Sequence, residues 1–219
     1  MLLKESKKIG YTKYFMNYIE KLKETPLQIE NFLSIESANK VYTLIDNYQN
    51  WEVRSNFKQT YEFEKSKFEQ GYFSYWYNNI RDKEFIHNLL KILNFDFEIS
   101  RLLNDNFFVP QSIFVSKYIK GHFLSPHDDK APDRKYAFVY NLTKDADESK
   151  GGCLNFIDDD NNVTHKLLPK FNSLNIFDVV NIKNRHFVSE VTDIEYKRYS
   201  ISGWLTETDI KMKSKNSLI

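Results

Sequence analysis

Residues 136–143 read Tyr-Ala-Phe-Val-Tyr-Asn-Leu-Thr, a short run of aromatic and β-branched residues that predicts a strand. It is one of seven such runs that follow one another from about residue 109 onward, with turn residues between them. The seven runs are 112–118, 136–143, 153–157, 163–168, 174–180, 187–191 and 196–205. Many short strands at this spacing are typical of a β-sandwich or a barrel.

The chain before residue 109 has a different pattern, which favours helices. Residues 11–22 repeat apolar side chains at helical spacing, and Pro26 ends that pattern. Ser34 can cap a second helix with Ala38, Val41, Tyr42 and Ile45 on one face, and residues 82–93 predict a third. The aromatic segment 72–77 is more typical of a strand. We therefore expect an α+β fold with a mainly β core and a single domain over 1–219, in which 1–108 is mostly helical support and 109–205 is the core.

Composition narrows the class of protein. The formal net charge is +1, which argues against a protein whose main task is electrostatic capture of nucleic acid. Cys153 is the only cysteine, so an intrachain disulfide and a cysteine-rich metal site are excluded. Neither a signal-peptide core nor a run of about 20 apolar residues is present. We expect a cytoplasmic protein with no membrane partner, and the sequence does not indicate its oligomeric state.

Two histidines and one aspartate carry the strongest chemical signal. His127 and Asp129 stand two residues apart in Ser125-Pro126-His127-Asp128-Asp129, and His186 follows 59 positions after His127. Because side chains at i and i+2 of a strand share a face, His127 and Asp129 can bind the same ion near a strand end. Two imidazoles and one carboxylate are the ligands of a facial triad, which holds Fe(II) on one side and leaves open positions opposite.

A basic residue follows the second histidine. Arg198 stands twelve residues after His186, in Arg198-Tyr199-Ser200-Ile201-Ser202-Gly203-Trp204. A guanidinium can pair with a carboxylate through two parallel hydrogen bonds, so Arg198 is a candidate partner for the carboxylate of a co-substrate.

These motifs occur in an order that resembles the Fe(II)- and 2-oxoglutarate-dependent dioxygenases, especially their prolyl-hydroxylase-like branch. The resemblance covers roughly 90 of the 219 residues and rests on the segments 117–118, 123–129, 134, 138–143, 151–154, 186–191 and 198–204. It implies a double-stranded β-helix, a jelly-roll of the cupin type made of two packed sheets, with supporting helices before it.

The resemblance also implies roles for individual residues. His127, Asp129 and His186 would bind Fe(II) and form the catalytic centre. The remaining residues would line the 2-oxoglutarate pocket: Arg198 on the distal carboxylate, Ser200 beside it, Tyr118, and Asn141, which stands where relatives often have a second tyrosine. Trp204 would pack near the iron. The implied cofactor and co-substrates are Fe(II), 2-oxoglutarate and dioxygen, and the resemblance leaves room for ascorbate.

The expected reaction is a hydroxylation. The resemblance implies insertion of one oxygen atom of dioxygen into an unactivated C–H bond, with release of succinate and carbon dioxide. Halogenases of this superfamily lack the carboxylate ligand, so the presence of Asp129 favours hydroxylation. The substrate would be a prolyl, amino-acid or peptide-like group, either a small molecule or part of a polypeptide.

Two other classes of protein fit part of the pattern. A non-catalytic metal-binding or sensor module of the cupin type would keep the three ligands without turning over a co-substrate. A zinc hydrolase would use the same His-Asp-His set to activate a water molecule, and would need a general base that the sequence does not nominate. Neither class requires Arg198, so iron-dependent release of succinate from 2-oxoglutarate discriminates among the three.

Overall fold

The computed structural model describes residues 20–55, 66–73, 88–89, 91–94, 108–180 and 185–207. Its strands pair antiparallel in an 11-stranded sheet of order β1-β9-β6-β11-β4-β3-β5-β10-β7-β8, and β2 pairs with β3. The elements are β1 Leu27–Glu30, α2 Ile35–Asp46, β2 Glu52–Ser55, β3 Ser66–Phe73, β4 Phe108–Tyr118, β5 Phe123–His127, β6 Tyr136–Asn141, the 3-10 turn Glu148–Lys150, β7 Leu154–Ile157, β8 Val163–Leu167, β9 Ser173–Asp178, β10 His186–Val188 and β11 Arg198–Glu207.

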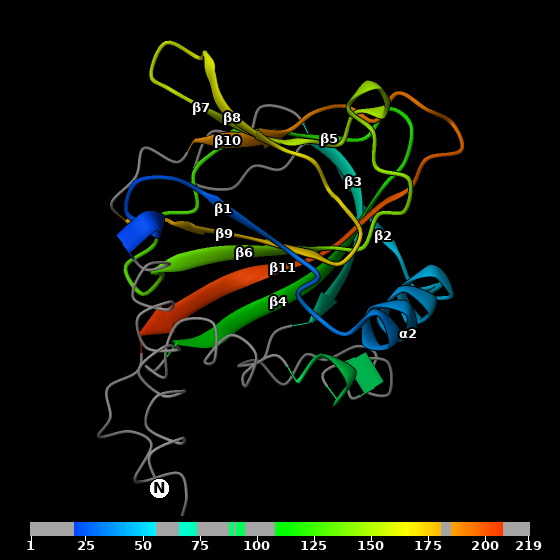
Figure 1. Cartoon of the computed structure of the whole chain (residues 1–219). Helices are drawn as coiled ribbons and strands as arrows, with labels where there is room; N and C mark the ends of the chain where they lie inside the picture. Colours follow the sequence, from blue (N-terminus) through cyan, green and yellow to red (C-terminus); the bar gives the residue numbers. More distant parts are fainter. Residues whose placement is uncertain are drawn as a thin grey trace, which may run out of the picture.

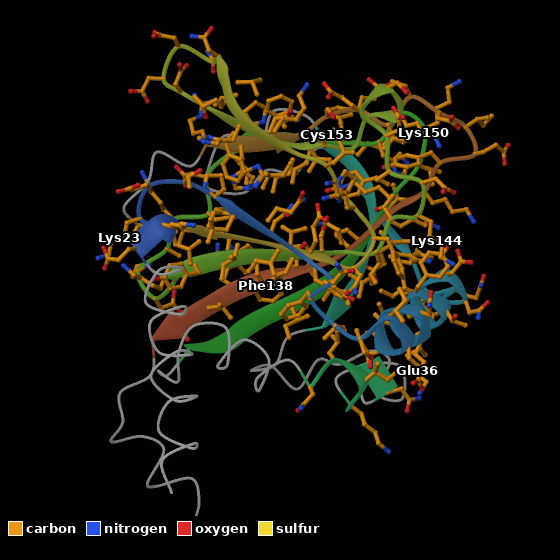
Figure 2. All side chains as sticks on the ribbon, viewed as in Figure 1. Lys23, Glu36, Phe138, Lys144, Lys150 and Cys153 are labelled. Atoms are coloured by element: carbon orange, nitrogen blue, oxygen red, sulfur yellow. The ribbon has the colours of Figure 1, made fainter. Side chains whose placement is uncertain are left out.

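The sheet folds over into two layers, as Figure 1 shows. The lower layer in that view contains β1, β9, β6, β11 and β4, the upper layer contains β5, β10, β7 and β8, and β3 connects them. Phe138 of β6 lies in the lower layer, whereas Cys153, just before β7, lies in the upper one (Figure 2). The faces that the two layers turn toward each other enclose an interior, and that interior contains the candidate site.

Strand alternation divides the lower layer between two cores. In β6, Tyr136, Phe138 and Tyr140 join a cluster with Val41 and Ile45 of α2. The residues between them face the other way, and Ala137 and Val139 join a second cluster between the layers. Alternate residues of β4, β9 and β11 are divided in the same manner. Because side chains alternate along a strand, each strand can pack on the helix and line the interior at once.

The helix α2 forms where the sequence predicts it. The side chain of Ser34 accepts a hydrogen bond from the Ser37 N–H, 3.1 Å away, and so caps the first turn. The expected apolar face is buried through Ala38, Val41 and Ile45. In the part of the chain that the structure describes, no helix is both long and apolar enough to cross a membrane.

All seven predicted runs form strands, with bounds that differ from the prediction by at most four residues. The assignment of residues 1–108 to helical support is incomplete, because β1, β2 and β3 also lie there. β1 joins the sheet by pairing with β9, β3 by pairing with β4 and β5, and β2 by pairing with β3. The pairings of β1 and β3 are long-range contacts, which local sequence pattern does not report. Of the other expected elements, the described parts of 11–22 and 82–93 are helical or in a turn, 72–73 belong to β3, and the rest lies outside the described residues.

Candidate active site

The three expected metal ligands converge in the interior. Strands β5 and β10 pair antiparallel with His186 directly opposite His127, and Asp129 follows β5 by two residues. One ligand atom from each side chain lies within 4.8 Å of the others. The Asp129 carboxylate oxygens are 3.9 Å from His127 Nε2 and 3.5 Å from His186 Nε2. All three side chains are at most 13% exposed, so the group forms a compact and nearly buried donor set.

The environment of His127 keeps its imidazole neutral. Burial is the main cause that lowers its pKa to about 4, and the neighbouring His186 lowers it further, while Asp129 raises it. Its Nδ1 lies 2.9 Å from the Ser125 carbonyl oxygen and can donate to it, which leaves Nε2 facing the other two ligands. A neutral imidazole oriented through its second nitrogen is the form in which histidine binds a metal.

The ring of His186 is fixed by aromatic packing. Its centroid lies 5.6 Å from that of Phe156 and 5.0 Å from that of Phe177, and both phenylalanines belong to the interior cluster. These contacts come from both layers, because Phe156 lies on β7 and Phe177 on β9. The position of His186 therefore depends on the closure of the fold.

Arg198 is a buried cation in the same interior. It is 2% exposed and begins β11 opposite Tyr118, whose ring centroid lies 4.7 Å from the guanidinium carbon. Its Nη1 donates to Ser200 Oγ at 3.1 Å, and its Nε has no hydrogen-bond partner. Burial lowers the pKa of Arg198, and among the described residues no carboxylate pairs with it. A buried guanidinium without an anion is unfavourable, so this place suits a negatively charged ligand.

A row of polar side chains crosses the lower layer beside Arg198. Ser200 of β11 lies between Ser116 of β4 and Asn141 of β6, and Asn141 is opposite Ser173 of β9. All four are at most 2% exposed. The Asn141 amide nitrogen donates to Ser173 Oγ at 3.2 Å, whereas its Oδ1 has no hydrogen-bond partner. Asn141 is thus held in place with one polar atom unused.

Two glycines allow this arrangement. A Cβ on Gly151 would lie 1.8 Å from the Glu190 carbonyl oxygen, and one on Gly152 would lie 3.0 Å from Arg198 Cδ. Both residues also have positive φ, which glycine adopts without strain. The Gly-Gly pair in the sequence therefore lets the β7 layer pack directly on the stem of Arg198.

Arg134 contacts both Trp204 and the backbone of the ligand Asp129. The Arg134 guanidinium carbon lies 3.5 Å from the Trp204 ring centroid, and its Nη1 donates to the Asp129 carbonyl oxygen at 3.2 Å. Arg134 was expected at the site only through the family resemblance. Tyr196, a buried tyrosine two residues before Arg198, was not among the expected site residues, although period-two spacing would place both on one face.

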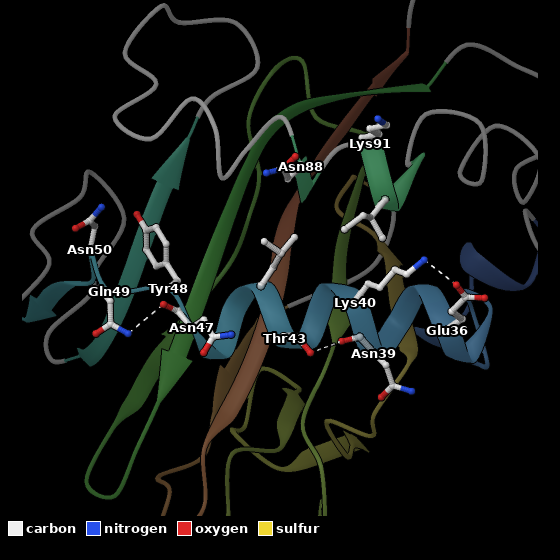
Figure 3. Close-up of a pocket in the computed structure, with 12 residues that line it drawn as sticks. Glu36, Asn39, Lys40, Thr43, Asn47, Tyr48, Gln49, Asn50, Asn88 and Lys91 are labelled. Carbon is white, nitrogen blue, oxygen red and sulfur yellow. Dashed lines mark hydrogen bonds and ion pairs between the residues drawn. The ribbon is translucent and has the colours of Figure 1, made fainter.

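A separate groove of about 950 Å³ lies along α2, and Figure 3 shows its lining. Asparagine and glutamine side chains gather there, and Glu36 forms an ion pair with Lys40 at 2.7 Å. None of the predicted site residues contributes to this groove. It offers no histidine, so it does not resemble the donor set between β5 and β10.

Comparison with known proteins agrees with this geometry. Residues 113–206 match the family model of the 2OG-Fe(II) oxygenase superfamily. Prolyl 3-hydroxylase sudestada1 of Drosophila melanogaster is 35% identical over 104 residues, which cover 42% of this chain and 19% of that protein. Prolyl 3-hydroxylase OGFOD1 of Mus musculus is 37% identical over 94 residues, or 41% and 17% of the two chains. The chain thus spans about a fifth of the length of these relatives.

Solved structures share the fold at low identity. A Trichoplax adhaerens prolyl hydroxylase in complex with a hypoxia inducible factor peptide fragment has a TM-score of 0.67 at 20% identity, covering 92% of each chain. A viral collagen prolyl hydroxylase from Paramecium Bursaria Chlorella virus-1 has a TM-score of 0.52 at 16% identity, covering 84% of this chain and 96% of that one. These neighbours confirm the expected double-stranded β-helix. Residues 113–206 thus match the 2OG-Fe(II) oxygenase superfamily, as the order of the motifs predicted, and the relatives similar to this segment are named prolyl 3-hydroxylases.

Proposed function

We propose that this chain is an Fe(II)- and 2-oxoglutarate-dependent hydroxylase acting on a prolyl group of a peptide-like substrate. The main observation behind the proposal is that His127, Asp129 and His186 converge in the interior of the fold. The same interior contains Arg198, which is buried and has no carboxylate partner among the described residues. The names of the relatives support a prolyl substrate, and the matched segment includes every residue on which the proposal depends.

The donor set fits ferrous iron. His127, Asp129 and His186 would hold the ion through two imidazole nitrogens and one carboxylate, the ligand types that Fe(II) takes in non-haem oxygenases. The three residues lie at or just beyond two paired strand ends, so they would hold the ion from one side. The depressed pKa of His127 favours the deprotonated nitrogen that metal binding requires.

The polar interior fits 2-oxoglutarate. Arg198 would bind its distal carboxylate, with Ser200 and Tyr118 on either side of the guanidinium. Asn141 stands opposite Ser200 in the strand register, and its unused Oδ1 would accept a hydrogen bond from a water molecule or from Ser200. The shorter Asn141 side chain would leave more room there than a tyrosine.

The bound iron and co-substrate would supply the oxidising chemistry: dioxygen and 2-oxoglutarate are consumed, succinate and carbon dioxide are released, and one oxygen atom enters a C–H bond of the substrate. The protein would contribute binding and orientation. His127, Asp129 and His186 fix the place of the reaction, Arg198 fixes one end of the co-substrate, and the apolar cluster around Phe156 and Phe177 excludes bulk water.

Succinate release tests this proposal. Purified protein supplied with Fe(II), 2-oxoglutarate and a pool of proline-containing peptides should form succinate and add one oxygen atom to a peptide, as seen by mass spectrometry. His127→Ala should abolish both products because it removes a ligand. The matched control is His165→Ala, which removes an exposed histidine of β8. Equal succinate formation by all three proteins would contradict the proposal.

The same assay separates the two alternatives. A cupin-type binding module would bind metal without forming succinate, and a zinc hydrolase would need neither dioxygen nor 2-oxoglutarate. Neither alternative provides an anionic ligand for the buried guanidinium of Arg198, whereas an oxygenase provides the carboxylate of 2-oxoglutarate. The oxygenase is favoured for this reason.

We further propose that one domain carries this activity and that the protein is cytoplasmic. The single sheet that joins β1 to β11 supports the first point. The one cysteine, Cys153, is a buried free thiol, which supports a reducing compartment.

A further inference from the structure

Tyr196 is a buried tyrosine whose hydroxyl group has no partner. The residue is 4% exposed and belongs to the interior cluster together with Tyr118 and Val191. Its Oη makes no hydrogen bond with the described residues. Buried tyrosine hydroxyl groups usually find a partner, and leaving one unsatisfied destabilises the fold. The hydroxyl of Tyr196 is therefore available to donate a hydrogen bond to a bound ligand.

Burial places Tyr196 on the same side as Arg198. Residues 196 and 198 lie two apart where the chain enters β11, and both side chains are buried within reach of each other's charge. Lys197 between them is exposed, and Tyr199 after them packs in the other core, under α2. This alternation continues through Ser200, which binds the Arg198 guanidinium.

The guanidinium has one edge left for a ligand. Nη1 donates to Ser200, and Tyr118 covers the guanidinium at 4.7 Å, whereas Nε has no partner. The groups whose charge acts on Arg198 are Tyr118, Tyr196 and Cys153, and none of them is a carboxylate. A carboxylate placed at the edge formed by Nε and Nη2 could accept from both nitrogens.

The phenol of Tyr196 is a donor at neutral pH. Burial raises the pKa of Tyr196 to about 12, and the nearby charge of Arg198 opposes that rise. The hydroxyl therefore keeps its proton and can donate to an anion held by Arg198. One carboxylate, with two oxygens, would satisfy both orphaned donors, Nε of Arg198 and Oη of Tyr196.

We propose that Tyr196 binds the distal carboxylate of 2-oxoglutarate, donating a hydrogen bond to it beside Arg198. This assignment rests on the proposed function and adds a residue that the expected ligand set did not contain. It gives the co-substrate a donor from the segment before β11, in addition to Arg198 and Ser200 within β11.

Calorimetric titration of 2-oxoglutarate into Mn(II)-loaded protein tests the assignment without turnover, because Mn(II) binds the same donor types as Fe(II). Tyr196→Phe keeps the ring and removes only the hydroxyl. A hydrogen bond to a charged group contributes enough that we expect the Kd for 2-oxoglutarate to rise about tenfold or more. The affinity for Mn(II) should not change, since Tyr196 is not a ligand.

The matched control is Tyr140→Phe. Tyr140 is also a buried tyrosine, but its hydroxyl donates to Asn172 Oδ1 at 2.9 Å in the core under α2. The Tyr140→Phe variant should bind 2-oxoglutarate with the affinity of the wild type, although its free energy of unfolding should be lower.

Two results would overturn the role of Tyr196 but leave the proposed function intact. One is an unchanged affinity of Tyr196→Phe for 2-oxoglutarate. The other is an equal loss of Mn(II) affinity, which would show that Tyr196 has only a structural role. A wild-type chain that binds Mn(II) but not 2-oxoglutarate would overturn the proposed function, and the assignment with it.

Discussion

Arg198 is buried and has no carboxylate partner among the described residues, so its charge destabilises the ligand-free protein and can bind an anion. Among the described residues its side chain donates a hydrogen bond to Ser200 alone, and its aromatic neighbour Tyr118 compensates the charge only in part. Removing an uncompensated buried charge can stabilise a protein. An apolar substitution of Arg198 should therefore weaken anion binding and leave the free energy of unfolding unchanged or higher.

We expect Arg198→Met to leave the ligand-free protein as stable as the wild type, or more stable by about 1–3 kcal/mol, because an apolar side chain replaces an unpaired cation. The same change should weaken 2-oxoglutarate binding by at least about a hundredfold, through loss of a charge-assisted bidentate pair. Denaturant unfolding and calorimetric titration measure the two effects. A variant that is destabilised yet binds normally would show that Arg198 is structural.

Gly152 offers a second test at the residue scale, with Gly121 as its matched control. Both have positive φ, of 71° and 79°, so alanine strains the backbone by roughly 1 kcal/mol at either position. A Cβ at Gly152 would lie 3.0 Å from Arg198 Cδ, whereas one at Gly121 meets nothing within 4 Å. Gly152→Ala should therefore weaken 2-oxoglutarate binding severalfold and Gly121→Ala should not. Equal affinity of the two variants would remove Gly152 from the pocket.

At the scale of elements, Asn172 ties the strands to the chain before α2. Its Oδ1 accepts from the Leu33 N–H at 3.0 Å and from the Tyr140 hydroxyl at 2.9 Å, and its Nδ2 donates to the Leu33 carbonyl oxygen at 2.8 Å. Asn172 is 2% exposed and sits just before β9. One side chain thus fixes the entry to α2 against both β6 and β9.

Asn172→Ala should destabilise the protein by about 3 kcal/mol or more, because it leaves three buried polar groups unsatisfied. Asn161→Ala is the control, since both residues have a positive φ, of 58° at Asn172 and 64° at Asn161, but Asn161 lies exposed in the turn between β7 and β8. It should cost only the backbone strain of roughly 1 kcal/mol. Urea unfolding of both variants measures the difference, and equal losses would show that the hydrogen bonds of Asn172 contribute little.

At the scale of the whole molecule, folding places two imidazoles in a nearly dry interior. Burial and His186 hold the pKa of His127 near 4 in the folded protein, against an ordinary value near 6.5. Between these two values the unfolded chain binds the proton and the folded chain does not. The metal-free fold should therefore lose stability as the pH falls from about 6.5 to about 4, and keep it above that window.

The His127 contribution to this loss should be on the order of 3 kcal/mol, the equivalent of the pKa difference. His127→Gln removes the titrating group, so its unfolding free energy should fall less with acidification than that of the wild type. Unfolding of both metal-free proteins at pH 7.5 and pH 4 gives the comparison. Parallel losses in the two proteins would show that His127 is not buried in its neutral form.

The sequence determined the parts whose signal is local: the seven strand runs, the cap and apolar face of α2, and the types of residue that suit a ferrous ion and a keto diacid. It did so because strand and helix periodicities express which face of an element meets the core. Tertiary structure alone decided that His186 pairs directly opposite His127 across 59 positions and that β1 to β3 extend the sheet. It also decided that Nε of Arg198 and Oη of Tyr196 make no hydrogen bond with the residues that the structure describes. Cross-strand register and burial arise from contacts between distant segments, which no local pattern contains.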